Sequence, residues 1–100
     1  MRKEQFKHAF QFLACYFHQA FSLEFDKPED AVGKFIEDSD AKTRLAVVRE
    51  LRQVLAVFAD HELEDAAFEL GCYYYPQWHR GISMRVWLEE VIRALERPVI

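Results

Sequence analysis

The chain has 100 residues, of which 51% are hydrophobic and 15% aromatic, so it holds enough apolar material for the core of one domain. Gly and Pro occur only three times each, which excludes collagen-like and low-complexity proteins and favours one mostly helical domain over residues 1–100. Thirteen Lys and Arg against seventeen Asp and Glu give a net charge of -4, the wrong sign for direct binding to nucleic acid.

Two helices are predicted before residue 40. An apolar stripe at helical spacing predicts a first helix from about Lys3 to Ala20, with Phe6, Phe10, Leu13 and Phe17 facing inward. Pro28 suits a first helical position, and the two acids after it suit the positive end of the helix dipole, so a second helix is expected to begin there. Its expected inward residues are Ala31, Val32, Phe35 and Ile36.

The third predicted helix is the longest. Ser39 or Asp40 is expected to cap its N-terminus. Its inward stripe is expected to contain Leu45, Val48, Leu51, Leu55 and Phe58. Its charged residues fall largely outside that stripe, and these are Arg44, Arg49, Glu50 and Arg52.

The C-terminal part predicts two more helices. Asp60 suits the N-cap of a fourth helix that Gly71 ends, with Leu63, Ala66, Ala67 and Leu70 inward. Residues 72–81 are expected to form a loop. Ser83 is expected to cap a fifth helix that ends before Pro98, with Trp87, Leu88, Val91, Ile92 and Leu95 inward. Five helices with short connections predict an all-α fold, a single antiparallel helical bundle.

The sequence contains few groups suited to catalysis. The four histidines lie in four different segments, and the three glycines stand apart, so neither a spacing typical of zinc ligands nor a phosphate-binding loop is present. A metal-dependent enzyme using Cys72, His79 and a histidine of the first helix is the least favoured alternative. We therefore expect no enzyme, no cofactor and no metal.

The two cysteines and the hydropathy pattern bear on location. Neither Cys15 nor Cys72 belongs to a Cys-x-x-Cys pair, and reduced thiols in the cytoplasm are the simplest interpretation. Lys7, His8 and Gln11 interrupt the apolar stretch that a secretory signal would need. There is no run of 18 apolar residues, so no membrane span is predicted.

Acidic residues gather in two places. Residues 24–40 hold seven acids and two lysines, and residues 60–69 hold five acids and no Lys or Arg. Such faces are either simply solvated or complementary to a basic partner. The tyrosine-rich segment 73–76 admits a similar choice, because its rings either close the end of the bundle or stay exposed as anchors for a protein partner.

Three groups of residues, in this order along the chain, resemble the motifs of one protein family. The first is Tyr16-Phe17-His18-Gln19 followed by Pro28-Glu29-Asp30-Ala31, the second is Leu70-Gly71-Cys72-Tyr73-Tyr74 followed by Pro76, and the third is Arg85-Val86-Trp87-Leu88. With them the chain resembles, from about Phe6 to Leu95, the immunity proteins of bacterial contact-dependent growth inhibition (CDI) systems, of the CdiI type. It departs from the family pattern at Ala20 and Tyr75, where the family often has an acid.

The resemblance implies a cytoplasmic protein that binds and neutralises the C-terminal toxin domain of its own CDI system. Many such toxins are nucleases with basic surfaces, so it also implies an electrostatic match to the acidic excess. Alone, the protein is expected to be a monomer or weak dimer. The expected toxin-binding residues are Asp26, Glu29, Asp30, Glu37, Asp38, Glu62, Glu64, Asp65, Tyr74 and Tyr75. The alternative is a small helical regulatory or scaffold module that acts through protein contacts of the last helix and the tyrosine segment.

Overall fold

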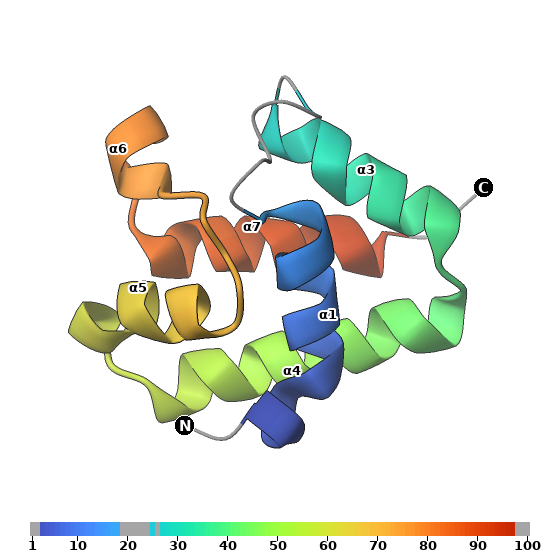
Figure 1. The fold of residues 1–100 in the computed structure, drawn as a ribbon, viewed down its shortest axis with the longest axis horizontal. Coiled ribbons are helices and arrows are strands. Elements are labelled where there is room, and N and C mark those ends of the chain that lie inside the picture. The colour runs from blue at the N-terminus through green and yellow to red at the C-terminus, as the bar shows by residue number, and fades with distance from the viewer. Residues whose placement is uncertain (1–2, 19–24, 26, 98–100) are drawn as a thin grey trace.

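The computed structural model describes residues 3–18, 25 and 27–97. Within these ranges it contains helices and no strand, which confirms the prediction of an all-α fold. The elements are a 3-10 turn, η1 (Lys3–Phe6), and the helices α1 (Lys7–Tyr16), α3 (Pro28–Asp38), α4 (Ala41–Val57), α5 (Asp60–Glu69), α6 (Pro76–Arg80) and α7 (Met84–Glu96) (Figure 1).

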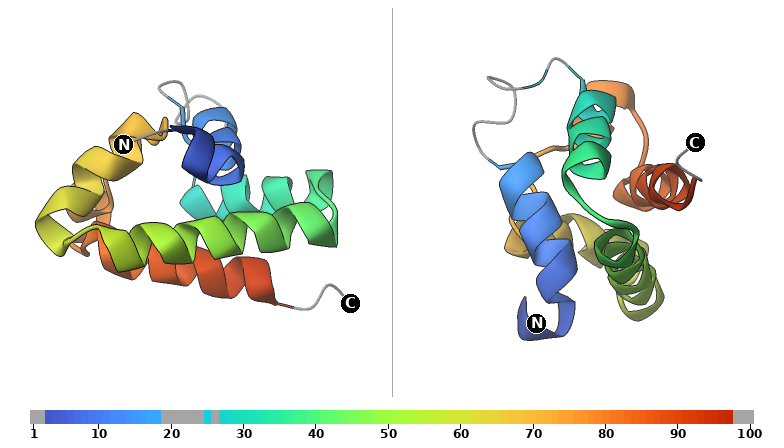
Figure 2. Two further views of the ribbon diagram at one scale, coloured as in Figure 1. Left: turned by 90° about the horizontal axis from the view of Figure 1, so that it is seen from below. Right: turned by 90° about the vertical axis from the view of Figure 1, so that its right-hand side faces the viewer.

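In the described part of the chain, the core is formed by α1, α3, α4, α5 and α7. The long helices α4 and α7 lie side by side and run in opposite directions, whereas α1 crosses α4 and α3 closes the remaining side (Figure 2). α5 and α6 pack near the N-terminal end of α7. The largest side chains that are almost completely buried come from all the long helices except α3 and from the segments that flank them: Phe12, Leu13, Phe17, Leu51, Val54, Leu63, Leu70, Leu88 and Leu95.

Several helix ends follow the predicted signals. The Asp40 carboxylate caps α4 by accepting a hydrogen bond from the Thr43 backbone N–H at 2.8 Å. The Ser83 hydroxyl caps α7 in the same way by accepting from the Val86 N–H at 3.1 Å. Gly71 follows α5 with a φ of 91°, a backbone conformation that residues with a Cβ rarely adopt. These local signals are strong because each satisfies a backbone group that the helix itself leaves free.

The first helix is shorter than predicted. α1 ends at Tyr16, and the predicted end at Ala20 lies outside the described residues. Phe17 leaves the helix, and its ring packs edge-on against Phe12 and Trp87, with ring centroids 5.6 and 5.1 Å away. Its carbonyl oxygen accepts a hydrogen bond from the Tyr73 N–H at 2.7 Å. A tertiary contact therefore holds the residue that follows α1, and the apolar spacing did not contain this information.

The predicted stripe of α4 was wrong at two positions. Leu45 was expected in the core but is 59% exposed, whereas Glu50 was expected outside the stripe but is only 5% exposed. The Glu50 carboxylate instead caps the N-terminus of α1, because its Oε1 accepts the backbone N–H groups of His8 and Ala9 at 2.8 and 3.0 Å. Its Oε2 lies 2.6 Å from His8 Nδ1. Since α1 has no side-chain cap of its own, α4 supplies one.

Two predictions around α5 also need correction. The N-cap of α5 is Ala59, not Asp60, and Asp60 is the first helical residue. The Glu62 side chain accepts the Ala59 N–H at 2.8 Å, so the helix start is stabilised from inside. Residues 72–81, expected to be a loop, contain the short helix α6, which begins at Pro76 and ends at Gly81 with a φ of 68°. Pro at the first position of a helix and Gly at its C-terminal end are typical helix signals, and the prediction of a loop did not take them into account.

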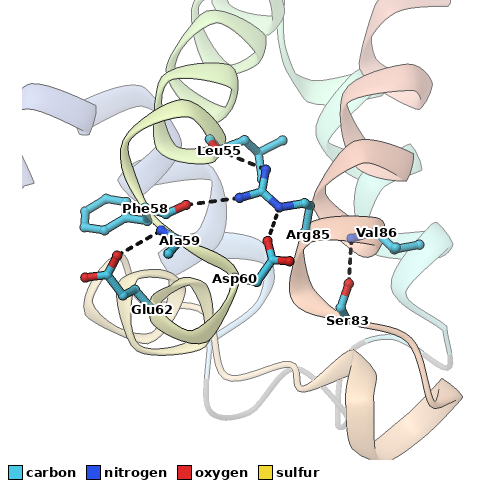
Figure 3. Close-up of polar contacts among 8 residues, drawn as sticks. All are labelled: Leu55, Phe58, Ala59, Asp60, Glu62, Ser83, Arg85 and Val86. Atoms are coloured by element: carbon cyan, nitrogen blue, oxygen red, sulfur yellow. Dashed lines mark hydrogen bonds and ion pairs between the residues drawn. The ribbon is translucent and has the colours of Figure 1, made fainter.

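Arg85 of α7 joins three elements at one corner of the fold (Figure 3). Its guanidinium donates hydrogen bonds to the Leu55 and Phe58 carbonyl oxygens at 3.1 and 3.0 Å, and its Nε bonds to the Asp60 carboxylate. These carbonyls belong to the C-terminal end of α4, where intrahelical donors are missing. The planar guanidinium thus satisfies the end of α4 and the start of α5 together.

We expect Arg85→Ala to lower the free energy of unfolding by about 1–3 kcal/mol, because the substitution leaves two carbonyls without their donor. Urea denaturation followed by circular dichroism measures the change. Arg52→Ala is the matched control, since Arg52 forms an exposed pair with Glu96, and such pairs contribute little. Equal losses for the two variants would contradict the role assigned to Arg85.

Candidate protein-binding surface

The acidic residues predicted to bind a partner lie on two separate helices, α3 and α5, which occupy different parts of the molecule (Figure 1). Every acid of this set that the structure describes is exposed, and Asp26 lies outside the described residues. The structure therefore does not bring the predicted acids together in one patch. Each helix has to be considered by itself.

On α3 the carboxylates are partly compensated. Asp38 accepts a hydrogen bond from the Tyr16 hydroxyl at 2.8 Å and lies 3.4 Å from the Lys34 ammonium. Burial and the hydrogen bond to Asp38 raise the pKa of Tyr16 to about 12. Glu29 and Asp30 occupy the first turn, where they stabilise the positive end of the helix. Three of the four acids of α3 thus already have a structural role, and only Glu37 has no such role among the described contacts.

On α5 the division is different. Asp60 binds Arg85 and Glu62 binds the Ala59 N–H, so both are engaged at the start of the helix. Glu64 and Asp65 are exposed, and within the described part of the chain no Lys or Arg lies at ion-pair distance from them. Glu69, which the sequence analysis did not choose as a binding residue, is exposed in the same way.

The two predicted tyrosines differ in exposure. Tyr74 is only 4% exposed, and its ring packs against Trp87 at 5.0 Å and stacks on His79 at 5.2 Å. Tyr74 therefore helps to form the core, and its prediction as an exposed anchor does not fit its position. Tyr75 is half-buried. Burial raises the pKa of the Tyr75 hydroxyl, and the nearby Glu64 and Asp65 carboxylates raise it further.

Among the described residues, three other aromatic side chains are exposed. Tyr73 lies in the tyrosine-rich segment whose rings were expected either to close the bundle or to stay exposed, whereas Phe68 and Trp78 were not chosen as binding residues. Phe68 of α5 and Tyr73 are 45% and 42% exposed, and their rings meet edge to face at 5.0 Å. Trp78 of α6 is 84% exposed. The helical spacing of α5 contained a signal for Phe68, because this residue falls outside the stripe that Leu63, Ala67 and Leu70 form. No comparable signal existed for Trp78, because residues 72–81 were not predicted to be helical.

The described helices form grooves between them, two of which border α3. The larger, about 630 Å³, runs between α3 and α7 and is lined by Val32, Gly33, Ile36, Val91 and Ala94, with charged side chains at its edges. The smaller, about 480 Å³, is lined by residues of α1, α3 and the start of α4, including Cys15 and Tyr16. His8 and Asp38 also line the smaller groove, but among the described contacts no hydrogen bond joins Cys15 to His8, whose Nδ1 lies 2.6 Å from Glu50 Oε2. Among the described residues, no three His, Cys, Asp or Glu side chains are arranged to hold a metal ion.

The cysteines are free and differ in environment. Cys15 is exposed, whereas Cys72 is buried and its thiol donates to the Tyr74 carbonyl oxygen at 3.5 Å. Burial raises the pKa of Cys72 from 9.0 to about 12, so the thiol stays neutral in the fold at any physiological pH. Burial of the neutral Cys72 thiol contributes fully to the free energy of unfolding below about pH 9, and this contribution is lost as the pH rises toward 12.

We expect Ellman's reagent at pH 8 to modify one thiol, that of the exposed Cys15, rapidly in the native protein, and the second only after denaturation, because burial hinders both thiolate formation and access at Cys72. The absorbance at 412 nm gives both rates. In Cys15→Ser the rapid phase should disappear. If the rapid phase remains in this variant, Cys72 is not the protected thiol that its burial indicates.

Among the described helices, none combines the length and the apolar character needed to cross a membrane.

A comparison with curated protein sequences gives no match. Among solved structures, the crystal structure of a CdiA-CT/CdiI complex from Y. kristensenii 33638 matches with a TM-score of 0.85 and 26% sequence identity, covering 95% of this chain and 97% of that chain. The family model described as CdiI immunity protein matches residues 5–95. The chain therefore belongs to the CdiI immunity protein family, whose members are non-enzymatic inhibitors of toxins.

Proposed function

We propose that this chain binds the C-terminal toxin domain of the CdiA protein of its own system and blocks that toxin inside the producing cell. The match of the family model over residues 5–95 carries this proposal. The similar structure from Y. kristensenii supports it, because the crystal that contains this fold is a CdiA-CT/CdiI complex. The proposed location is the cytoplasm, where free thiols such as Cys15 and Cys72 remain reduced.

The proposed mechanism is occupation of the toxin surface. The described residues supply exposed carboxylates and aromatic rings on a helical scaffold. The toxin that fits such a surface is basic, and a nuclease is the proposed class because nucleases need cationic surfaces to hold phosphates. Complementary charge speeds association and disfavours wrong partners, which suits an inhibitor that must capture its toxin before damage occurs.

The test uses the full chain and the C-terminal domain of the CdiA protein encoded next to it. Co-expression of the two should rescue growth, and size-exclusion chromatography of the mixed proteins should give a single earlier peak than either alone. The toxin domain of an unrelated CdiA protein is the control and should remain toxic and unbound. If cells that carry this chain die at the same rate as cells without it, the proposed function is wrong.

A separate measurement tests the toxin class. Purified toxin domain is incubated with total RNA and with DNA, with and without an equimolar amount of this chain. We expect degradation of one nucleic acid by the free toxin and none in the complex. Intact nucleic acid with a toxin that still stops growth would exclude a nuclease and leave the immunity function unaffected.

A further inference from the structure

The outer face of α5 carries exposed acidic and aromatic side chains whose presence the fold does not require. We define the α5 face as the exposed residues on this side of the helix together with the ring that touches them, namely His61, Glu64, Asp65, Phe68, Glu69 and Tyr73. Glu64 and Phe68 are four residues apart, and Asp65 and Phe68 are three apart, so their side chains share one side of the helix. The opposite side is buried through Leu63, Ala66, Ala67 and Leu70.

The charges of the α5 face are unfavourable for the isolated chain. α5 holds five carboxylates and no Lys or Arg, whereas α3 holds four carboxylates and Lys34. Asp65 and Glu69 are like charges at a spacing of four residues, which destabilises a helix. Glu69 also stands in the last turn, at the negative end of the helix dipole, where a cation would be preferred. Among the described residues, no ion pair or hydrogen bond engages the carboxylates of Glu64, Asp65 and Glu69. Their negative charge is therefore available to a cationic surface of another molecule.

The aromatic rings of the α5 face are the second, independent observation. Phe68 and Tyr73 form an edge-to-face pair at 5.0 Å, and nearly half of each side chain is exposed. Tyr73 is held in place through its backbone, because its N–H donates to the Phe17 carbonyl oxygen. A rigid aromatic pair surrounded by charged residues is typical of the energetically important centre of a protein interface.

The acids of α3 lack this combination. Asp38 is engaged by Tyr16 and Lys34, and Glu29 and Asp30 match the positive end of their own helix. Among the apolar residues of α3, Ala31, Val32 and Phe35 are buried and Ile36 is half-buried. Apart from Glu37, the described acids of α3 are therefore already engaged by the chain itself, and α3 presents no exposed ring.

We propose that the α5 face, and not the acidic side of α3, is the surface that docks the toxin. The inference rests on the proposed function. The occupant is a toxin surface on which Lys or Arg side chains surround an apolar depression, with the cations facing Glu64, Asp65 and Glu69 and the depression receiving Phe68 and Tyr73. The carboxylates set the association rate, and the rings set the lifetime of the complex.

The first experiment compares two double charge reversals. Glu64→Lys with Glu69→Lys changes the α5 face, and Glu37→Lys with Glu89→Lys is the matched control, because each pair has one acid in a helix interior and one in a last turn. All four acids are exposed, and the net charge changes equally. Stopped-flow or surface plasmon resonance at about 50 mM NaCl, where screening is weak, measures association with the purified C-terminal toxin domain.

We expect the α5 reversal to slow association by about tenfold or more and to weaken binding about 100-fold, with a flatter dependence on salt, whereas the control changes either quantity less than about threefold. Equal effects of both pairs would mean that only net charge matters and would overturn the proposal. A larger effect of the control pair would also overturn it. Circular dichroism of each variant checks that the helices are retained.

A second experiment tests the rings. Phe68→Ala with Tyr73→Ala should raise the dissociation rate about 100-fold while changing the association rate little, and Leu45→Ala, an exposed residue of α4, should leave both rates unchanged. An unchanged dissociation rate for the ring variant would contradict the docking surface. The wild-type chain distinguishes the two proposals. If the wild type binds the toxin domain and protects cells, and the α5 variants bind the toxin as the wild type does, only the docking role of the α5 face is refuted. A wild type that neither binds nor protects refutes the proposed function itself.

Discussion

Glu50→Ala is expected to lower the free energy of unfolding by about 2–4 kcal/mol, a large effect for a residue with no role in the predicted binding surface. Glu50 is 5% exposed and accepts two backbone N–H groups at the start of α1, from His8 and Ala9. Alanine would remove the acceptor of both donors, of which the Ala9 N–H is buried and the His8 N–H partly buried, and would remove the negative charge that faces the positive end of α1. Thermal and urea denaturation followed by circular dichroism measure the loss.

Two further variants give the Glu50 prediction its controls. Glu50→Gln keeps one oxygen acceptor near the His8 and Ala9 N–H groups and removes only the charge, so it should lose about half as much stability as Glu50→Ala. Arg49→Ala, at the exposed neighbouring position, should change stability little. If Glu50→Ala were as stable as Arg49→Ala, α1 would not depend on α4 for its cap.

Gly71→Ala is expected to destabilise the fold by about 2–5 kcal/mol, through two additive effects. The φ of 91° is unfavourable for any residue with a Cβ. A Cβ at this position would also lie 2.7 Å from the Ala14 Cβ and 2.8 Å from the Ala14 Cα, so α1 would have to move. Displacement of α1 would weaken the hydrogen bond between Tyr73 and Phe17 as well.

The other two glycines separate these effects. Gly81 has a φ of 68°, and a methyl group at this position would meet no atom within 4 Å, so Gly81→Ala should lose only the backbone contribution, about 1–2 kcal/mol. Gly33 lies inside α3 with open space around it, so Gly33→Ala should stabilise the protein by about 0.5–1 kcal/mol. Urea midpoints of the three variants give the order. A Gly71→Ala variant no less stable than Gly81→Ala would show that α1 does not restrict this position.

Three helix-terminal residues and most of the last helix could be predicted from the sequence alone. Asp40, Ser83 and Gly71 end or begin helices because each satisfies a local requirement of the backbone, and such requirements depend on the neighbours in the chain. All five predicted inward residues of α7, Trp87, Leu88, Val91, Ile92 and Leu95, are buried, and only Met84 at the start of the helix was missed. A helix between several neighbours buries a broad face, so its period suffices to identify the inward residues.

The candidate surface was only partly accessible in this way. The composition of residues 60–69 already indicated an acidic helix, but not that Arg85 and the Ala59 N–H engage Asp60 and Glu62 and so leave Glu64 and Asp65 exposed without such partners. Tyr74 and Tyr73 are neighbours of one residue type, and the sequence offers no reason to bury one and expose the other. The direction in which the segment after Gly71 leaves α5 determines which of the two tyrosine rings is buried.

The sequence by itself determined the helical class, most helix boundaries, most of the inward residues of α7 and the resemblance to the immunity family, because these follow from spacing, capping and local residue order. Only the tertiary structure decided that Leu45 is exposed, that Glu50 is buried and that α1 ends at Tyr16. The physical reason is that each of these depends on a contact between distant segments. α1 crosses α4 at Glu50, and Tyr73 binds the Phe17 carbonyl, and no periodicity within one helix records where another helix will lie across it.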